Sequence, residues 1–314
     1  MTRTAVIEVS GLSKRYGTTV AVDDVSFEVY DGEIFGLIGP NGAGKTTTME
    51  CVEGVRTPDA GRVKVLGFDP ARDQYRLQQR IGVQLQEAHL QKRIKVGEAI
   101  SLWASLYKSV VNHDQLLAQL GLSEKRNAWF MTLSGGQKQR LFIALALIND
   151  PEVVFLDELT TGLDPQARHA IWDLVRSIRT RGKTVFLTTH LMEEAERLCD
   201  RVAIIDRGRI IDIDTPSGLV RRHCPQRSVL LTTEDSRAEE HLGTLPGVTV
   251  TRGDAVDNPL VMPLVIRGDA HDLMTSVIQC LADHQIRVID FQTMVPTLED
   301  VFLKVTGHSI RGTS

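Results

Sequence analysis

Short runs of apolar and β-branched residues alternate with Gly and Asp turns in the first part of the chain. IEVSGL, VAVDDVSFEV and EIFGLI have this composition, and the third run leads directly into a glycine-rich segment. Such runs bounded by turn residues are typical of strands. We therefore predict strands at 7–12, 20–29 and 33–38, the last of which delivers the chain into a loop.

After Arg80 the apolar residues recur three or four positions apart, as they do on one face of a helix. They are Ile100, Leu102, Trp103, Leu106 and Tyr107, then Leu116, Leu117, Leu120 and Leu122. This spacing predicts a helical insert of about 87–150. Strand-like runs return at 152–157 and 184–188 with an amphipathic segment, 166–180, between them, which predicts a βαβ unit and a parallel sheet.

The composition of the chain changes near residue 221. A hairpin-like stretch turns at Arg207-Gly208 and leads to Thr215-Pro216. Beyond it, SVLLTT, GVTVTR, LVIRG and IRVIDFQ alternate like strands, and 271–284 is amphipathic. We predict two domains, an α/β domain at 1–221 and a small α+β appendage at 222–314.

Composition and charge narrow the possible functions. The 314 residues carry a net charge of −4, which comes from 222–314, whereas 1–221 hold equal numbers of basic and acidic residues. This balance argues against a nucleic-acid partner. No apolar run approaches the about 20 residues of a transmembrane helix, and no secretory signal is readable at the N-terminus. We expect a cytosolic chain whose cysteines, Cys51, Cys199, Cys224 and Cys280, are reduced.

The segment GPNGAGKTT matches the phosphate-binding loop G-x-x-x-x-G-K-[ST]. It follows a predicted strand and precedes a predicted helix. Glycines let backbone N–H groups surround a polyphosphate, Lys45 reaches the β- and γ-phosphates, and Thr46 offers its hydroxyl to Mg²⁺. ATP and Mg²⁺ are the expected cofactors. The residues of the loop are Gly39, Pro40, Asn41, Gly42, Ala43, Gly44, Lys45, Thr46 and Thr47.

Two adjacent acids, Asp157 and Glu158, end the apolar run VVFL. Ligands of open α/β sheets bind at the carboxyl ends of the strands. Asp157 is therefore a candidate for the Mg²⁺ shell, and Glu158 for the base that activates water.

The segment LSGGQKQR precedes a hydrophobic helical run and offers a second helix N-terminus for an anion. Its candidate binding residues are Ser134, Gly135, Gly136 and Gln137. LSGGQ upstream of a strand ending in LDE, in a chain that contains GPNGAGKTT, resembles the ATP-binding cassette (ABC) ATPases. The resemblance covers about residues 5–221. It implies a mixed sheet with helices, a helical subdomain at about 87–150 and a catalytic site that two cassettes share, most simply as a homodimer.

Further positions match the pattern of the ABC ATPases one by one. In that family the residue matching Tyr16 stacks on adenine, the residue matching Gln86 joins the metal site, and the residue matching His190 contacts the γ-phosphate. Gln84 is close enough to Gln86 to leave that assignment open. TGLD at 161–164 resembles the loop by which two cassettes touch. One position departs from the pattern: Leu159 stands where the family has proline, and we expect hydrolysis to survive the change.

The resemblance also suggests which kind of cassette this is. PTLEDVFLKVTGH at 296–308 resembles the ending of ATP-binding subunits of the daunorubicin-resistance exporters. An exporter of drugs, antibiotics or lipid-like compounds is therefore expected, peripheral to the cytoplasmic face of the membrane and docked on separate transmembrane permease subunits through residues near Gln86 and at 87–93. An importer cassette and a soluble cassette that acts on ribosomes or DNA are the alternatives.

Overall fold

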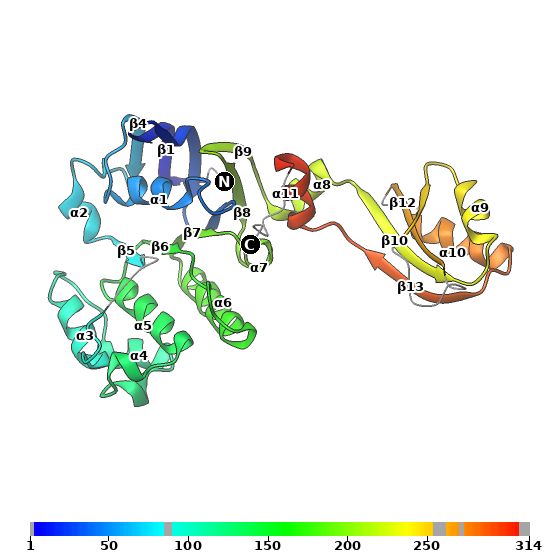
Figure 1. The fold of residues 1–314 in the computed structure, drawn as a ribbon. Coiled ribbons are helices and arrows are strands. Elements are labelled where there is room, and N and C mark those ends of the chain that lie inside the picture. The colour runs from blue at the N-terminus through cyan, green and yellow to red at the C-terminus, as the bar shows by residue number, and fades with distance from the viewer. Residues whose placement is uncertain (1–2, 85–89, 254–261, 270–272, 308–314) are drawn as a thin grey trace. The chain divides into compact units, whose positions relative to one another are not determined.

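The computed structural model describes residues 3–84, 90–253, 262–269 and 273–307, and they fall into two compact units that divide between Pro216 and Ser217 (Figure 1). The predicted limits, 1–221 and 222–314, would place the boundary inside helix α8 (Pro216–His223), and they stay a prediction.

The first unit contains two sheets. A three-stranded antiparallel sheet, in the order β2-β1-β4, comprises β1 (Ala5–Tyr16), β2 (Thr19–Tyr30) and β4 (Ala60–Val65). A six-stranded mixed sheet, in the order β5-β6-β7-β3-β8-β9, comprises β3 (Ile34–Ile38), β5 (Ile81–Gln84), β6 (Val153–Asp157), β7 (Thr184–Thr189), β8 (Arg201–Asp206) and β9 (Arg209–Asp214). The predicted strands and the α/β fold class are confirmed.

Helices cover both faces of the six-stranded sheet. Helix α1 (Lys45–Glu53) packs against strands of both sheets, in the core to which Phe35 and Leu37 also belong. Gly36, between those two residues in β3, faces the Cys199 side chain at the end of α7 (Met192–Leu198) instead. Since successive strand residues point to opposite faces, α1 and α7 lie on opposite sides of the sheet.

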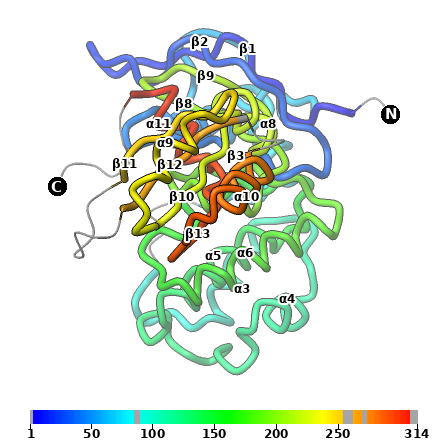
Figure 2. The backbone as a smooth tube through the Cα atoms, turned by 90° about the vertical axis from the view of Figure 1, so that its right-hand side faces the viewer, coloured from blue at the N-terminus to red at the C-terminus, as the bar shows by residue number. Residues whose placement is uncertain are grey.

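The helical segment of this unit lies apart from the antiparallel strands (Figure 2). It contains α3 (Val96–Ala104), α4 (His113–Gln119), α5 (Gly135–Leu147) and two short 3₁₀ helices, Ser123–Lys125 and Phe130–Thr132. The short α2 (Gln74–Gln78) precedes β5. The apolar spacing predicted the helices but not all of their contacts, because Leu102 and Leu106 are exposed and α3 ends before Leu106.

The predicted βαβ unit is present. β6 and β7 are parallel neighbours joined by α6 (Pro165–Thr180), which begins at the Asp164 cap and buries Ile171, Trp172, Val175 and Ile178 along one stripe. The hairpin of β8 and β9 turns at Arg207 and Gly208, whose φ values of 47° and 79° match the turn type that suits the strand twist.

The second unit has a ferredoxin-like βαββαβ order. Its antiparallel sheet, in the order β11-β12-β10-β13, contains β10 (Gln226–Thr233), β11 (Thr249–Arg252), β12 (Met262–Asp269) and β13 (Val288–Met294). Helices α9 (Ala238–Gly243) and α10 (Leu273–Asp283) share a core with β10 and β12, and α11 (Leu298–Thr306) follows. Among the described residues, no helix has both the length and the apolar character needed to cross a bilayer.

Candidate nucleotide-binding site

Three buried strands end at the same edge of the six-stranded sheet. β3 and β6 are both parallel neighbours of β7, so their carboxyl ends lie side by side. The phosphate-binding loop follows β3. Asp157 is the last residue of β6, Glu158 comes directly after it, and His190 follows β7. The topology therefore brings together four residues predicted from separate parts of the sequence, Lys45, Asp157, Glu158 and His190.

The conformation of the loop depends on its glycines for two different reasons. Gly44 has a φ of 101°, and a Cβ there would lie 2.4 Å from the Ala21 carbonyl oxygen. Gly39 has an ordinary φ, but a Cβ would lie 2.2 Å from the Ile205 carbonyl oxygen. The loop thus passes so close to neighbouring backbone that side chains are excluded at both positions. Helix α1 begins immediately after Gly44, with its N-terminus at the loop.

Lys45 lies inside this loop and is 4% exposed. Its Nζ donates hydrogen bonds of 3.0 Å to the carbonyl oxygens of Gly39 and Pro40 and lies 3.4 Å from Glu158 Oε1. Burial lowers the pKa of Lys45, and the charge of Glu158 offsets part of that effect. The lysine is therefore held over the loop by groups that a polyphosphate would compete with.

Asp157 and Thr46 supply oxygen donors beside the loop. Burial raises the pKa of Asp157, opposed by hydrogen bonds from the Thr188 hydroxyl, which donates to Oδ1, and from Thr46. Mg²⁺ prefers oxygen ligands and is usually held by one or two protein groups together with phosphates and water. Thr46 and Asp157 offer oxygen donors of this kind, so the pair fits a Mg²⁺ ion that is also bound by phosphates.

Glu158 lies between two side chains that favour its ionised form. The neighbouring His190 side chain and the positive charge of Lys45 outweigh the effect of burial and lower the pKa of Glu158 to about 2. The His190 Nδ1 atom lies 3.4 Å from Glu158 Oε1. The backbone of Glu158 has a φ of 46°, in the left-handed region that few residues other than glycine adopt. The carboxylate is thus ionised and fixed at the end of β6.

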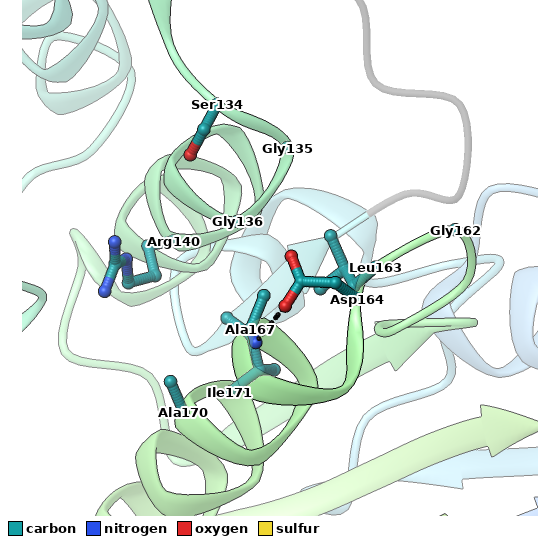
Figure 3. A pocket seen from close by; sticks show the side chains of 10 residues that line it. All are labelled: Ser134, Gly135, Gly136, Arg140, Gly162, Leu163, Asp164, Ala167, Ala170 and Ile171. Carbon is teal, nitrogen blue, oxygen red and sulfur yellow. Dashed lines mark hydrogen bonds between the residues drawn. The ribbon is translucent and has the colours of Figure 1, made fainter.

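A second set of predicted residues lies at the start of α5. Ser134 caps the helix: its Oγ accepts from Gln137 N at 3.3 Å, and its own N donates to Gln137 Oε1 at 3.0 Å. Ser134 and the two glycines after it line a pocket of 340 Å³ that faces the loop at 162–164 and the first turns of α6 (Figure 3). Asp164 in that loop accepts from Ala167 N at 2.9 Å.

The remaining predicted residues fall in three different situations. Tyr16, at the end of β1, is 42% exposed, and Arg56 Cζ lies 5.1 Å from the centre of its ring. Gln86 lies outside the described residues, as does the first part of the predicted contact segment 87–93. Gln84, the alternative to Gln86, is the last residue of β5 and is 4% exposed.

Sequence reasoning missed two groups at this edge. Thr188 donates to Asp157 and accepts from the Glu158 backbone N at 3.2 Å, and Glu194 binds Thr160 in the turn after Glu158. The position of Thr188 at the end of a parallel strand was the available signal. Glu194 lies on α7 and gave no signal in the sequence.

Comparison with known proteins decides the family. The family described as ABC transporter matches residues 22–161. Two Nod factor export ATP-binding proteins I, from Paraburkholderia xenovorans and Ralstonia nicotianae, are 45% and 38% identical to the chain. The alignments cover 98% of the chain in both cases, and 99% and 96% of the relatives. The chain belongs to the ABC transporter family. It is an ATP-binding subunit, and subunits of this kind are ATPases coupled to transport.

Two further comparisons agree with this assignment of the ABC subunit. A daunorubicin resistance ATP-binding protein, DrrA3 of Streptomyces coeruleorubidus, is 36% identical over 97% of each chain. A solved structure of an ATP-binding subunit of an ABC transporter superposes with a TM-score of 0.63 at 29% identity, covering 69% of this chain and 92% of that one.

Proposed function

We propose that this ABC subunit hydrolyses ATP at a site completed by a second copy of the chain and so drives export through separate transmembrane permease subunits. The observation that carries the proposal is the convergence of Lys45, Asp157, Glu158 and His190 at one sheet edge. Export of drugs, antibiotics or lipid-like compounds is supported by the names of the relatives, which export Nod factors or confer daunorubicin resistance.

Each residue of the edge has a role that its surroundings support. Lys45 leaves Glu158 and the loop carbonyls to bind the β- and γ-phosphates of ATP, while Tyr16 stacks on the adenine ring. Thr46 and Asp157 would hold a Mg²⁺ ion, which supplies positive charge against the developing charge of the phosphates, with the glutamine at 84 or 86 nearby. Glu158 accepts the proton of the attacking water, and His190 orients the γ-phosphate. Leu159 in place of proline leaves this carboxylate in position.

The second copy supplies the missing half of the site. One chain carries one phosphate-binding loop and one LSGGQ. In the assembled dimer, residues 134–137 of one copy cover the ATP held by the other, and the loop at 161–164 contacts the partner. Donors from both sides then stabilise the charge on the γ-phosphoryl oxygens, so the dimer forms with ATP and separates after hydrolysis. No nucleic acid takes part, and the subunit works at the cytoplasmic face of the membrane.

Two measurements test the proposal. Lys45→Ala should abolish ATPase activity, because the lysine provides the main cationic contact to the phosphates. Glu158→Gln protein loaded with ATP should elute from gel filtration as a dimer, alone or with its membrane partner. A protein that remains a monomer under both conditions contradicts the shared site, and a chain that binds ATP but hydrolyses none with any partner contradicts the assignment of Glu158.

A further inference from the structure

Glu194, on helix α7, is a carboxyl group buried in the interior of the first unit. It is 1% exposed, and its Oε1 accepts two hydrogen bonds, from Thr160 Oγ1 at 2.8 Å and from the Trp172 indole Nε1 at 2.9 Å. Both donor residues are also buried, with Thr160 1% and Trp172 2% exposed. Its Oε2 is buried with no hydrogen-bond partner among the described residues. A buried carboxyl oxygen without a hydrogen-bond partner lowers the stability of the fold, so its presence calls for an explanation.

The three residues of this Glu194 cluster, Glu194, Thr160 and Trp172, belong to three elements that carry the site. Thr160 lies two positions after Glu158, in the turn that follows β6. Glu194 lies four positions after His190, on the helix that the histidine loop enters. Trp172 lies on α6, whose first turns line the pocket at Ser134. One carboxyl oxygen therefore ties together the segments that position the candidate base, the histidine and the pocket.

The turn that carries Glu158 needs contacts with the interior to hold its conformation. Glu158 has a φ of 46°, which is unfavourable for a residue with a side chain. The backbone N of Glu158 is held by Thr188, and Thr161 N donates to the Glu158 carbonyl oxygen at 3.3 Å. Within this turn, Thr160 is the residue whose side chain is anchored in the interior through Glu194.

We infer that Glu194 is a positioning residue for ATP hydrolysis. Through Thr160 it fixes the turn after β6, and through its own helix it fixes the loop of His190, so that the Glu158 carboxylate and the His190 ring keep their mutual placement. The inference rests on the proposed function, in which Glu158 is the base. A misplacement of about 1 Å at a reacting group can cost about a hundredfold in rate, so a small shift of the turn is sufficient for a measurable effect.

The test compares four variants of the full-length chain by ATPase kinetics, by binding of a fluorescent ATP analogue and by thermal unfolding. Thr160→Val and Glu194→Ala each remove the Thr160 hydrogen bond and should lower kcat about tenfold to a hundredfold per folded molecule, with KM and Kd within about twofold of the wild type. Glu194→Gln keeps an oxygen that accepts both bonds and should retain most of kcat. Glu193→Ala, on the exposed side of the same helix, is the matched control.

The double variant separates positioning from general destabilisation. Because Thr160 and Glu194 act through one hydrogen bond, Thr160→Val combined with Glu194→Ala should be no slower than Glu194→Ala alone. If Glu194→Ala does not fold, Thr160→Val decides, since it preserves side-chain volume. ATPase activity that requires Glu158 but is unchanged in Thr160→Val overturns this inference and leaves the proposed function standing. Absence of any Glu158-dependent ATPase overturns both.

Discussion

Lys45 Nζ lies 3.4 Å from Glu158 Oε1, so the cation of the phosphate-binding loop is paired with the carboxylate that would activate water. Both side chains are nearly inaccessible to solvent, and the His190 ring also lies beside Glu158, with Nδ1 3.4 Å from Oε1. Binding of ATP must exchange this ion pair for contacts between Lys45 and phosphate.

Glu158→Gln should therefore separate binding from chemistry. The amide cannot take a proton from water, so hydrolysis should fall at least about a hundredfold, the range that a positioned base contributes. ATP should bind at least as tightly as to the wild type, because Lys45 no longer has to leave a carboxylate. Steady-state ATPase and equilibrium binding of a labelled nucleotide measure the two effects. A variant that keeps a tenth or more of the activity would place the base elsewhere.

Tyr16 should contribute to nucleotide affinity through its ring and not through its hydroxyl. Stacking of a base on an aromatic side chain contributes about 1–3 kcal/mol, so Tyr16→Ala should weaken ATP binding about five- to 150-fold, while Tyr16→Phe should bind like the wild type. Isothermal titration with ATP gives both constants. Tyr75→Ala is the control, because Tyr75 is also exposed and lies on α2. Equal weakening in both alanine variants would argue against stacking at Tyr16.

Two glycines of the phosphate-binding loop should differ in their tolerance of a methyl group. Gly42 and Gly44 both have a positive φ, so alanine at either position is strained. Only at Gly44 would the new Cβ meet backbone, the Ala21 carbonyl oxygen at 2.4 Å, whereas nothing lies within 4 Å at Gly42. In thermal or urea unfolding of the ATP-free chain, Gly44→Ala should be less stable than Gly42→Ala by about 1–3 kcal/mol. Equal stability of the two variants would show that the loop moves away without cost.

The cysteines should react with a thiol reagent in an order set by burial. Cys51, Cys199 and Cys280 are buried and Cys224 is partly exposed. Burial raises the pKa of Cys51 to about 11, so the thiolate, which is the reactive form, stays scarce there even at pH 9. The native chain should release about one equivalent of thionitrobenzoate quickly, and Cys224→Ser should remove it. Four equivalents should appear in denaturant. Rapid reaction of several thiols in the native chain would contradict the burial of the other three.

The local chemistry of the site was readable from the sequence because each part is a contiguous pattern. Residues that are neighbours in the chain identify each part: the loop at 39–47, the acids after VVFL and the capped start of α5. Their meeting at one sheet edge follows from parallel pairing of β3, β6 and β7. The βαβ pattern predicted the pairing of β6 with β7, and the place of β3 beside β7 came from the structure. The strands and the hairpin at Arg207-Gly208 were readable for the same reason.

Contacts between side chains far apart in the sequence were not readable. Thr160 and Trp172 meet Glu194 across 34 and 22 positions, and no periodicity specifies which of several glutamates on α7 turns inward. Helical spacing likewise predicted an apolar face through Leu102 and Leu106, although both side chains are more than half exposed. The need for glycine at position 39 arises from the Ile205 carbonyl, which only the folded sheet brings close.

The strand order of the second unit bears on how this unit could be inserted into the chain or removed from it during evolution. β10, the first strand of its sheet, is an antiparallel neighbour of β13, the last, with Ser228 opposite Met294. The chain therefore enters and leaves the sheet at adjacent points, as an inserted module does. Just outside these points, Lys304 of α11 donates to the His223 carbonyl oxygen of α8 at 2.6 Å. Deletion of the residues between the two helices could thus be closed by a short linker, so recombination could replace this module without redesigning the ATPase.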